Sequence, residues 1–194
     1  MRMKHELSAY EVHLSWSKIS GQTAKLIKDE IFIILTNEAT SSVRASICSL
    51  IGELGATIIN AKNEDEDIPE ENKKWPELMK KIQDLWSSNN DNMMEAGLKI
   101  MAGLFSYQSD EFTQYKRELY SIFKTGLEHN TVEIKIAAIG ALSSWIEGID
   151  FKAAKLYEDL VPTLMNALLT TVEKNVDQVF VWNLTEVHFN CLYI

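Results

Sequence analysis

Cysteine, proline and glycine are scarce in this sequence of 194 residues, which contains two, three and eight of them, respectively. Two cysteines, Cys48 and Cys191, are too few for a disulfide scaffold or a thiolate zinc site, and we expect Cys48 to be buried as a small apolar side chain. Few prolines and glycines exclude collagen-like and low-complexity chains, and they disfavour an all-β sandwich, which needs many tight turns.

Motifs for catalysis and metal binding are missing as well. The four histidines, His5, His13, His129 and His188, are scattered without an i, i+4 pair. The sequence has no glycine-rich phosphate loop, no Gly-x-Ser-x-Gly elbow and no Cys-x-x-Cys pair. We therefore expect neither an enzyme nor a bound cofactor or metal.

Long apolar runs are also missing. Residues 31–35 form an apolar run that is far shorter than the roughly 20 residues needed to cross a bilayer. Basic residues near the amino terminus are not followed by the apolar region of a secretory signal. The sequence therefore predicts no membrane association and a location in the cytosol or nucleus.

Negative charge, in contrast, is abundant, with a formal net charge of -9. This balance disfavours nucleic-acid binding through phosphate neutralisation and fits a partner with a basic surface. Six carboxylates lie close together: Glu64, Asp65, Glu66, Asp67, Glu70 and Glu71. The stretch lacks the glycine and the alternating spacing of a calcium loop. Two interpretations stay open, a solvated loop between structural units or an electrostatic attractor for a basic partner.

Apolar residues recur with the period of amphipathic helices almost throughout the chain. Three segments share one pattern, in which apolar residues follow an anchor at +4, +7 and +11. The three sets are Val43, Ile47, Leu50 and Leu54; Met94, Leu98, Met101 and Phe105; and Ile134, Ala138, Ala141 and Trp145. A preceding helix has its own apolar anchor 15 or 16 residues earlier, at Ile27, Leu78 and Leu119, and Leu164 fits the same spacing if Val179 is the fourth second-helix anchor. The chain is therefore predicted to repeat a helical hairpin.

The anchors recur at the spacing of about 40–47 residues that is typical of HEAT and armadillo repeats, if the acidic stretch is an insertion. We predict an all-α, right-handed α–α superhelix, a HEAT/armadillo-like solenoid of about four hairpins. The hairpins would span residues 10–60, 73–108, 112–148 and 152–190, with a loop at 61–72. A compact bundle of four or six helices is the alternative, whereas tetratricopeptide repeats, at about 34 residues, fit poorly.

Several short motifs resemble the amino-terminal HEAT repeats of the importin-β (karyopherin-β) nuclear transport receptors. They are Trp16-x-Lys-Ile-Ser, Lys25-x-x-Lys-Asp-Glu-Ile, Glu38-x-x-x-Ser-Val-Arg44 and Trp75-Pro-Glu-Leu-Met79. Within that family the chain is most similar to the importin-5, or karyopherin-β3, type. Members are several times longer, so the resemblance implies a fragment of such a receptor.

The resemblance also implies partners and a binding face. Family members bind Ran in its GTP form, carry basic cargo proteins, meet phenylalanine-glycine nucleoporins on the convex side, and occur in cytoplasm and nucleus. In the family the second helix of each repeat lines the concave face. Small residues dominate that face here, so part of it should pack on neighbouring second helices. The polar or aromatic exceptions and two flanking carboxylates are candidate partner contacts: Lys99, Tyr107, Ser143, Glu147, Glu53 and Glu95.

Two other functions stay possible, and the last repeat allows one further structural prediction. A HEAT scaffold of another kind, such as a phosphatase regulatory or chromatin-complex subunit, would share the repeat pattern, and an enzyme with an unrecognised site is the third possibility. The first helix of the last repeat carries Leu160, Leu164, Leu168 and Leu169, while the tail after Val176 lacks the second-helix pattern. With no further repeat to cover these leucines, we expect the chain to self-associate through this end or the tail to fold back over the helix predicted at 162–172.

Overall fold

A computed structural model describes residues 12, 15–61, 68–105 and 110–172, and within these ranges the chain forms helices and no strands. The elements that position the rest of the molecule are α2 (Gly21–Asn37), α3 (Ser41–Asn60), η1 (Glu70–Asn72), α4 (Leu78–Trp86), α5 (Asp91–Phe105), η2 (Asp110–Tyr115), α6 (Lys116–Glu128), α7 (Val132–Gly148), α8 (Phe151–Ala154), η3 (Lys155–Leu160) and α9 (Val161–Val172). The predicted all-α class is confirmed.

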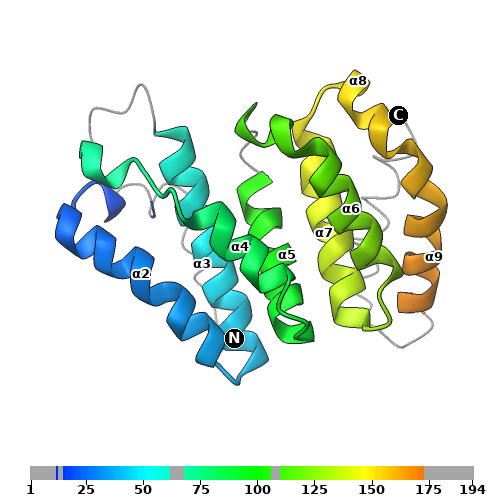
Figure 1. The fold of residues 1–194 in the computed structure, drawn as a ribbon, viewed down its shortest axis with the longest axis horizontal. Helices are drawn as coiled ribbons and strands as arrows, with labels where there is room; N and C mark the ends of the chain where they lie inside the picture. The colour runs from blue at the N-terminus through cyan, green and yellow to red at the C-terminus, as the bar shows by residue number, and fades with distance from the viewer. Residues whose placement is uncertain (1–11, 13–14, 62–67, 106–109, 173–194) are drawn as a thin grey trace, which may run out of the picture.

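The helices form successive hairpins, α2 with α3, α4 with α5, and α6 with α7, followed by α9 (Figure 1). In this view α2, α4, α6 and α9 form one layer, and α3, α5 and α7 lie behind them. We call the first set the A helices and the second set the B helices. The B helices begin at Ser41, Asp91 and Val132, 50 and 41 residues apart. These spacings fit the predicted long repeat, while the insertion before the second hairpin and the repeat boundaries stay predictions.

Local sequence signals account for the hairpin boundaries. Ser20 caps α2, because its hydroxyl oxygen accepts a hydrogen bond from the Thr23 amide at 3.3 Å. Such a cap stabilises a helix by about 1 kcal/mol. Between α4 and α5 the chain turns through Asn89, whose φ of 53° lies in the left-handed region that asparagine tolerates better than most residues. This short turn lets α4 and α5 pack on each other, as predicted.

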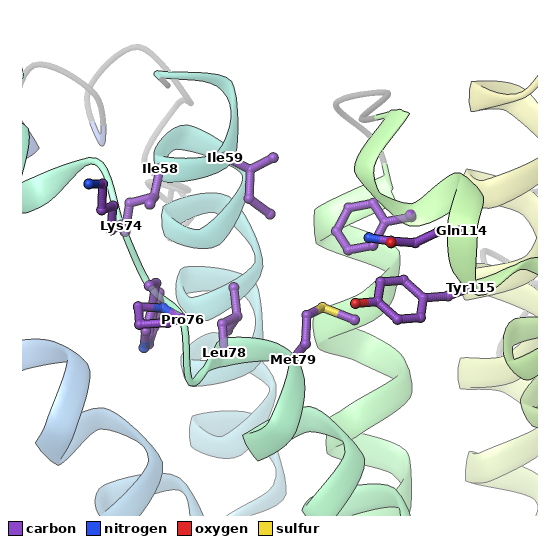
Figure 2. Close-up of a pocket in the computed structure, with 10 residues that line it drawn as sticks. Ile58, Ile59, Lys74, Pro76, Leu78, Met79, Gln114 and Tyr115 are labelled. Atoms are coloured by element: carbon purple, nitrogen blue, oxygen red, sulfur yellow. The ribbon is translucent and has the colours of Figure 1, made fainter. Parts of the chain in front are cut away.

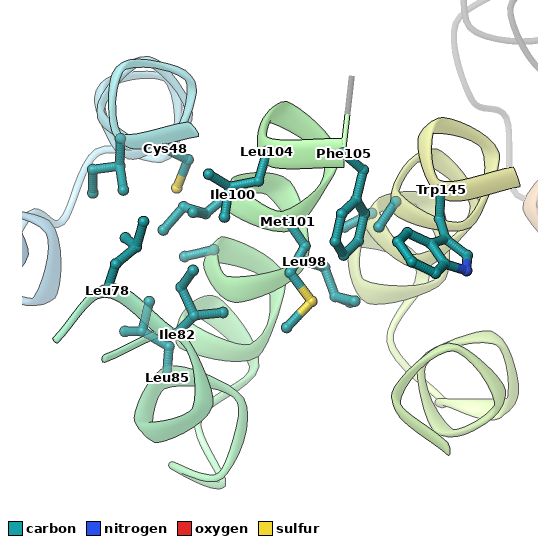
Figure 3. Close-up of a cluster of buried hydrophobic side chains, with 14 of the residues drawn as sticks. Cys48, Leu78, Ile82, Leu85, Leu98, Ile100, Met101, Leu104, Phe105 and Trp145 are labelled. Carbon is teal, nitrogen blue, oxygen red and sulfur yellow. The ribbon is translucent and has the colours of Figure 1, made fainter. Parts of the chain in front are cut away.

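The hydrophobic core runs continuously through the repeats, and Figure 3 shows the part that extends from Cys48 of α3 to Trp145 of α7. Phe105 at the end of α5 meets three aromatic rings edge-on, with centroid distances of 5.2 Å to Phe112, 6.3 Å to Phe123 and 5.1 Å to Trp145. Tyr157 extends the cluster into the fourth repeat, 6.0 Å from Phe123. Edge-to-face pairs of this kind stabilise a core beyond the area they bury, so the cluster ties three consecutive repeats together.

The predicted apolar stripes are confirmed for α7 and nearly so for α5, where only Met94 is half-buried. For α3 the predicted stripe is wrong, because Val43 is 43% exposed and Leu50 is 40% exposed. The buried side of α3 is rotated by about one residue, or roughly 100°, from the predicted stripe. The residues buried in α3 are Arg44, Cys48, Ile51, Gly52, Leu54, Gly55, Ala56 and Ile58. This helix contacts α2 on one side and α5 on another, so its buried arc is set by two neighbours instead of one.

The expectation of uncovered leucines on the last helix is also largely wrong. Leu160 and Leu164 are buried, and Leu168 packs against the core, because α9 contacts both α6 and α7. Leu169 is 60% exposed and matches the prediction. The tail residues 176–194 lie outside the described residues.

One expectation about membrane spans needs correction. Helix α3 has 20 residues and a mean hydropathy of 1.3 over its most apolar window, so by length and composition it could cross a bilayer. It was missed because glycine, alanine and serine break its apolar residues into short runs. In this fold the apolar character of α3 has another explanation, since 44% of that window is buried inside the protein, where the helix contacts α2 and α5.

Candidate protein-binding surface

The B helices contact each other directly, α3 with α5 and α5 with α7. Two of them approach closely at Gly52 and Gly103, where a Cβ atom added to Gly52 would lie 3.0 Å from the Gly103 Cα. The prediction that small residues on this side pack against neighbouring B helices is thus confirmed for these two glycines. The contact joins the B helices into one layer whose outer side is a single surface.

Five predicted contact residues lie on the side of the B helices that faces away from the A helices. In α5, Gly97 faces α4, and Glu95 and Lys99 each lie two residues from it, about 200° around the helix. In α7, Ala138 faces α6, and Ser143 and Glu147 lie five and nine residues later, roughly 140° and 180° around. In α3, an added Cβ at Gly55 would meet Leu78 of α4, and Glu53 lies two residues earlier, about 200° around the helix. We call Glu53, Glu95, Lys99, Ser143 and Glu147 the B-helix face.

The polar groups of the B-helix face are arranged in local pairs. The Lys99 ammonium lies 2.5 Å from a Glu95 carboxylate oxygen, one helical turn away. On α7 the Ser143 hydroxyl donates to the Glu147 carboxylate at 3.2 Å, and Glu147 itself is exposed. Ser143 is buried and the Glu95 side chain is only 12% exposed, whereas the Lys99 side chain is 34% exposed. Lys99 and Glu147 are therefore the groups of these pairs that a partner can reach. The remaining predicted contact, Tyr107, lies outside the described residues.

Beneath the Glu95–Lys99 pair lies the seam between α3 and α5, where Cys48 is buried as predicted. Burial raises the pKa of the Cys48 thiol to about 12, so the sulfur stays protonated at neutral pH. A protonated, buried thiol is a poor nucleophile, and Cys48 therefore packs as a small apolar side chain.

Polar links between successive repeats were missed in the sequence. Arg44 donates from Nη2 to the Asn92 side-chain oxygen at 2.9 Å, which joins the first repeat to the second, and from Nη1 to the Ala39 carbonyl at 2.8 Å. The Thr131 hydroxyl donates to the Asp91 carboxylate, which joins the second repeat to the third. The signal in the sequence was a polar residue near the start of each B helix, including the Arg44 of the Val-Arg motif.

Part of the predicted loop at residues 61–72 is ordered secondary structure packed against the rest of the protein. Residues 64–67 lie outside the described residues, but Ile68 is buried and residues 70–72 form η1. Glu70 accepts a hydrogen bond from the Lys73 ammonium at 2.6 Å, and this bond lowers the pKa of the Glu70 carboxyl. Glu71 packs against Gly21 at the start of α2. The expectation of a solvated loop over all of residues 61–72 is therefore wrong for its second half.

Buried hydrogen bonds hold this second half in place. Asn72 is fully buried. The backbone carbonyl of Asn72 accepts a hydrogen bond from the Trp16 indole N–H at 3.2 Å, and the side-chain NH₂ of Asn72 donates to the Ile19 backbone carbonyl at 2.8 Å. Nearby, the Lys28 ammonium donates to the Lys74 carbonyl at 2.7 Å and lies 5.3 Å from the centroid of the Trp16 ring. Burial lowers the pKa of Lys28. Trp16 and Lys28, which were noticed as motif residues, thus anchor the segment that enters α4.

Metal-binding geometry is missing from the described ranges, in which no group of three or more histidine, cysteine, aspartate or glutamate side chains could hold an ion.

Comparison with known families matches residues 39–192 to a family described as IPO5-like, TPR repeats. The repeats described above are longer than the tetratricopeptide unit that this description names. Among curated proteins, the chain is 21% identical over 162 residues to a probable importin-5 homolog from Dictyostelium discoideum. This match covers 82% of the chain and 14% of the relative, so the chain spans about a seventh of that protein's length.

Solved structures show the same fold. The structure of Kap121p matches with a TM-score of 0.62 and 17% identity, covering 98% of this chain and 18% of that one. Kap121p bound to Nup53p matches with a TM-score of 0.61 and 17% identity over 98% and 18% of the two chains. Kap121p bound to RanGTP matches with a TM-score of 0.58 and 19% identity over 90% and 16% of the chains.

Proposed function

Because the chain belongs to the importin-5-like family, we propose that it is part of a nuclear import receptor that binds Ran in its GTP form and carries protein cargo between cytoplasm and nucleus. The observation that carries this proposal is the family match over residues 39–192 together with the layer of B helices. The match favours a transport receptor over a phosphatase or chromatin scaffold.

The B-helix face is the proposed contact surface for Ran. It carries charges of both signs on three neighbouring helices, which suits a polar protein surface better than an apolar peptide. Kap121p, which has the same fold, binds RanGTP. We assign Lys99 and Glu147 the leading role, because they lie on different B helices and remain accessible to a partner.

Cargo binding is proposed for the acidic stretch of the sequence. The net charge of -9 favours approach of basic cargo proteins, and Glu64, Asp65, Glu66 and Asp67 are four consecutive carboxylates. Phenylalanine-glycine nucleoporins are proposed to meet the outer surface of the A helices, where Leu26 and Ile33 of α2 are more than half exposed. Exposed apolar side chains of this kind are typical of surfaces that meet a partner.

The test compares binding of the 194-residue chain to immobilised Ran loaded with GTP or with GDP. We expect binding to the GTP form and much weaker binding to the GDP form. A Lys99→Glu, Glu147→Lys double variant should weaken GTP-form binding by about tenfold or more, since like charges would then oppose the partner. The matched control is Lys80→Glu, Asp84→Lys on α4, an A helix, which should leave binding unchanged. Equal binding to both nucleotide forms would refute the proposal for this part of the receptor.

A further inference from the structure

In the middle of the row of helices, α5 packs against a B helix on each side (Figure 1). Its Gly103 faces Gly52 of α3. Phe105 lies about 200° further round α5 and meets Trp145 of α7 with a centroid distance of 5.1 Å. A B helix of this stack therefore has two opposite flanks, one for the preceding hairpin and one for the next.

On α3, the flank opposite α5 is exposed. Gly52 faces α5, whereas Val43 and Leu50 lie about 180° and 200° around the helix from Gly52. Val43 is 43% exposed, Leu50 is 40% exposed, and Ile47 between them is half-buried. We call Val43, Ile47 and Leu50 the α3 flank. Their spacing of i, i+4 and i+7 is that of a helix side that packs on another helix.

The neighbouring A helix leaves the same flank of the first hairpin open. Phe32 of α2 faces the second hairpin, where it meets Trp75 edge-on with a centroid distance of 6.0 Å. Ile34 and Glu30 each lie two residues from Phe32, about 160–200° around the helix, and both are exposed. The first hairpin thus presents an apolar flank, bordered by a carboxylate, on the side where a preceding hairpin would stack.

A second apolar stripe lies at the opposite end of the row, on α9 (Figure 1). Met165, Leu169 and Val172 lie about 80–140° around α9 from the buried Leu164. Leu169 is 60% exposed, Val172 is 47% exposed and Met165 is half-buried. We call Met165, Leu169 and Val172 the α9 stripe. It has the same i, i+4, i+7 spacing as the α3 flank, and α9 contains no charged residue.

We propose that a second copy of this chain covers the α3 flank with its α9 stripe, so that copies stack end to end. The contact repeats between molecules the packing of successive hairpins that joins α3, α5 and α7 within one molecule. Two α3 flanks facing each other are disfavoured, because the Glu30 carboxylates of both copies would then approach, whereas α9 offers an uncharged surface. Since the two surfaces differ, the contact is heterologous and each added copy leaves a free end.

The test uses the 194-residue chain and two double variants. Val43→Lys with Leu50→Lys places charge on the α3 flank, and Leu169→Lys with Val172→Lys places charge on the α9 stripe. In analytical ultracentrifugation, the average mass of the unmodified chain should rise with concentration past that of a dimer. The dissociation constant should be about 0.1 mM, because the contact is smaller than a standard interface. Each double variant alone should stay monomeric, because every copy then lacks one of the two surfaces.

Mixing the two double variants separates end-to-end stacking from a symmetric dimer. One variant keeps its α9 stripe and the other keeps its α3 flank, so an equimolar mixture should form a one-to-one complex and nothing larger. This complex should have the dissociation constant of the unmodified chain. A symmetric contact between α9 stripes would instead leave the α3-flank variant dimeric by itself, and a symmetric contact between α3 flanks would leave the α9-stripe variant dimeric.

A groove of about 410 Å³ beside the start of α4 supplies the control (Figure 2). It lies between α4 and η2 in the middle of the row, and Figure 2 shows Met79 and Tyr115 pointing toward each other across the gap. Tyr115 is 39% exposed, so Tyr115→Lys adds a charge to an apolar surface that belongs to neither end. This variant should associate like the unmodified chain.

Four results would overturn the proposal. They are an unmodified chain that stays monomeric up to about 1 mM, a mixture of double variants that contains only monomers, a double variant that dimerises by itself, and an equal loss of association from Tyr115→Lys. Circular dichroism and urea unfolding check that the lysine variants stay folded. Failure of Ran binding leaves this experiment unaffected, because the B-helix face shares no residue with the α3 flank or the α9 stripe.

Discussion

Gly52 of α3 and Gly103 of α5 touch through their backbones, although 51 residues separate them in the chain. A side chain at either position would push two B helices apart, and those helices form the layer that carries the proposed Ran-binding face. Gly140 of α7 is different, because an added Cβ would meet nothing within 4 Å. The three glycines therefore allow a matched test.

Replacing Gly52 by alanine should destabilise the protein. Overpacking typically costs about 1–3 kcal/mol, which outweighs the gain of about 0.5–1 kcal/mol from replacing a helical glycine by alanine. Gly140→Ala should show that gain alone and stabilise the protein. Urea unfolding followed by circular dichroism measures both values. If Gly52→Ala were as stable as Gly140→Ala, the close contact between α3 and α5 would be wrong.

The second prediction concerns the anchor formed by Trp16 and Asn72. Asn72→Ala removes the donor to the Ile19 carbonyl from a fully buried position, which should cost about 1–3 kcal/mol. Because the anchored segment includes Lys73 and Lys74, trypsin should cut there faster in the variant. Cleavage at Lys124, in the middle of α6, provides the internal control and should keep its rate. Unchanged cleavage at Lys73 and Lys74 would mean that the Trp16 bond to the backbone carbonyl of residue 72 and the Lys28 bond to the Lys74 carbonyl are enough to hold the segment.

Alkaline pH should unfold the protein through two buried acids. Burial raises the pKa of Cys48 to about 12 and that of Tyr157 to about 12, so the folded state favours their neutral forms. Their unfolded values are about 8.5 and 10. Below the unfolded pKa values, the two neutral groups make their full contribution to the free energy of unfolding. As pH rises from the unfolded pKa toward 12, the free energy of unfolding declines by about 1.4 kcal/mol per pH unit for each group that titrates.

Chemical unfolding between pH 8 and 11, in the presence of a reductant, tests this dependence. Cys48→Ala and Tyr157→Phe should each reduce the slope of the decline in the free energy of unfolding by about 1.4 kcal/mol per pH unit, over the pH range in which the replaced group titrates. Substituting the exposed Tyr115 by phenylalanine is the control and should leave the slope as it is. A decline that survives both buried substitutions would assign the alkaline sensitivity to other groups.

The acidic stretch should accelerate encounters with basic proteins. Replacing Glu64, Asp65, Glu66 and Asp67 by their amides should slow association with a nona-arginine probe, most strongly at low ionic strength, where the Debye length is about 30 Å at 0.01 M. Replacing Glu70 and Glu71 instead should have a smaller effect, because Glu70 is already paired with Lys73. Thermal stability should change little in the first variant. Equal association rates at low salt would make the stretch a plain connection between repeats.

Self-association through the carboxyl-terminal end remains a prediction, now limited to fewer residues. Leu169 and Val172 are exposed on α9, at 60% and 47%. Light scattering should show an apparent mass that rises with protein concentration, and Leu169→Lys with Val172→Lys should reduce this rise. Ile33→Lys on the outer side of α2 serves as the matched substitution. A larger effect from Ile33→Lys would place the contact on the outer surface of the A helices.

The sequence by itself determined the helical class, the hairpin repeat and the stripes of α5 and α7. These features follow from local rules, because apolar residues at helical spacing specify which side of a helix is buried. It also indicated that Gly52 and Gly103 face other helices, since small residues on an otherwise exposed side are useful only where a backbone approaches closely.

Only the tertiary structure decided which side of α3 is buried, how the second half of the acidic stretch is held, and where the groove lies. Each depends on residues far apart in the chain: α3 packs between α2 and α5, Trp16 meets Asn72, and Met79 faces Tyr115. Periodicity carries no information about such pairs, because the free energy of a nonlocal contact depends on how whole helices stack. The repeat could therefore be predicted from the sequence, whereas its anchor and its groove required the fold.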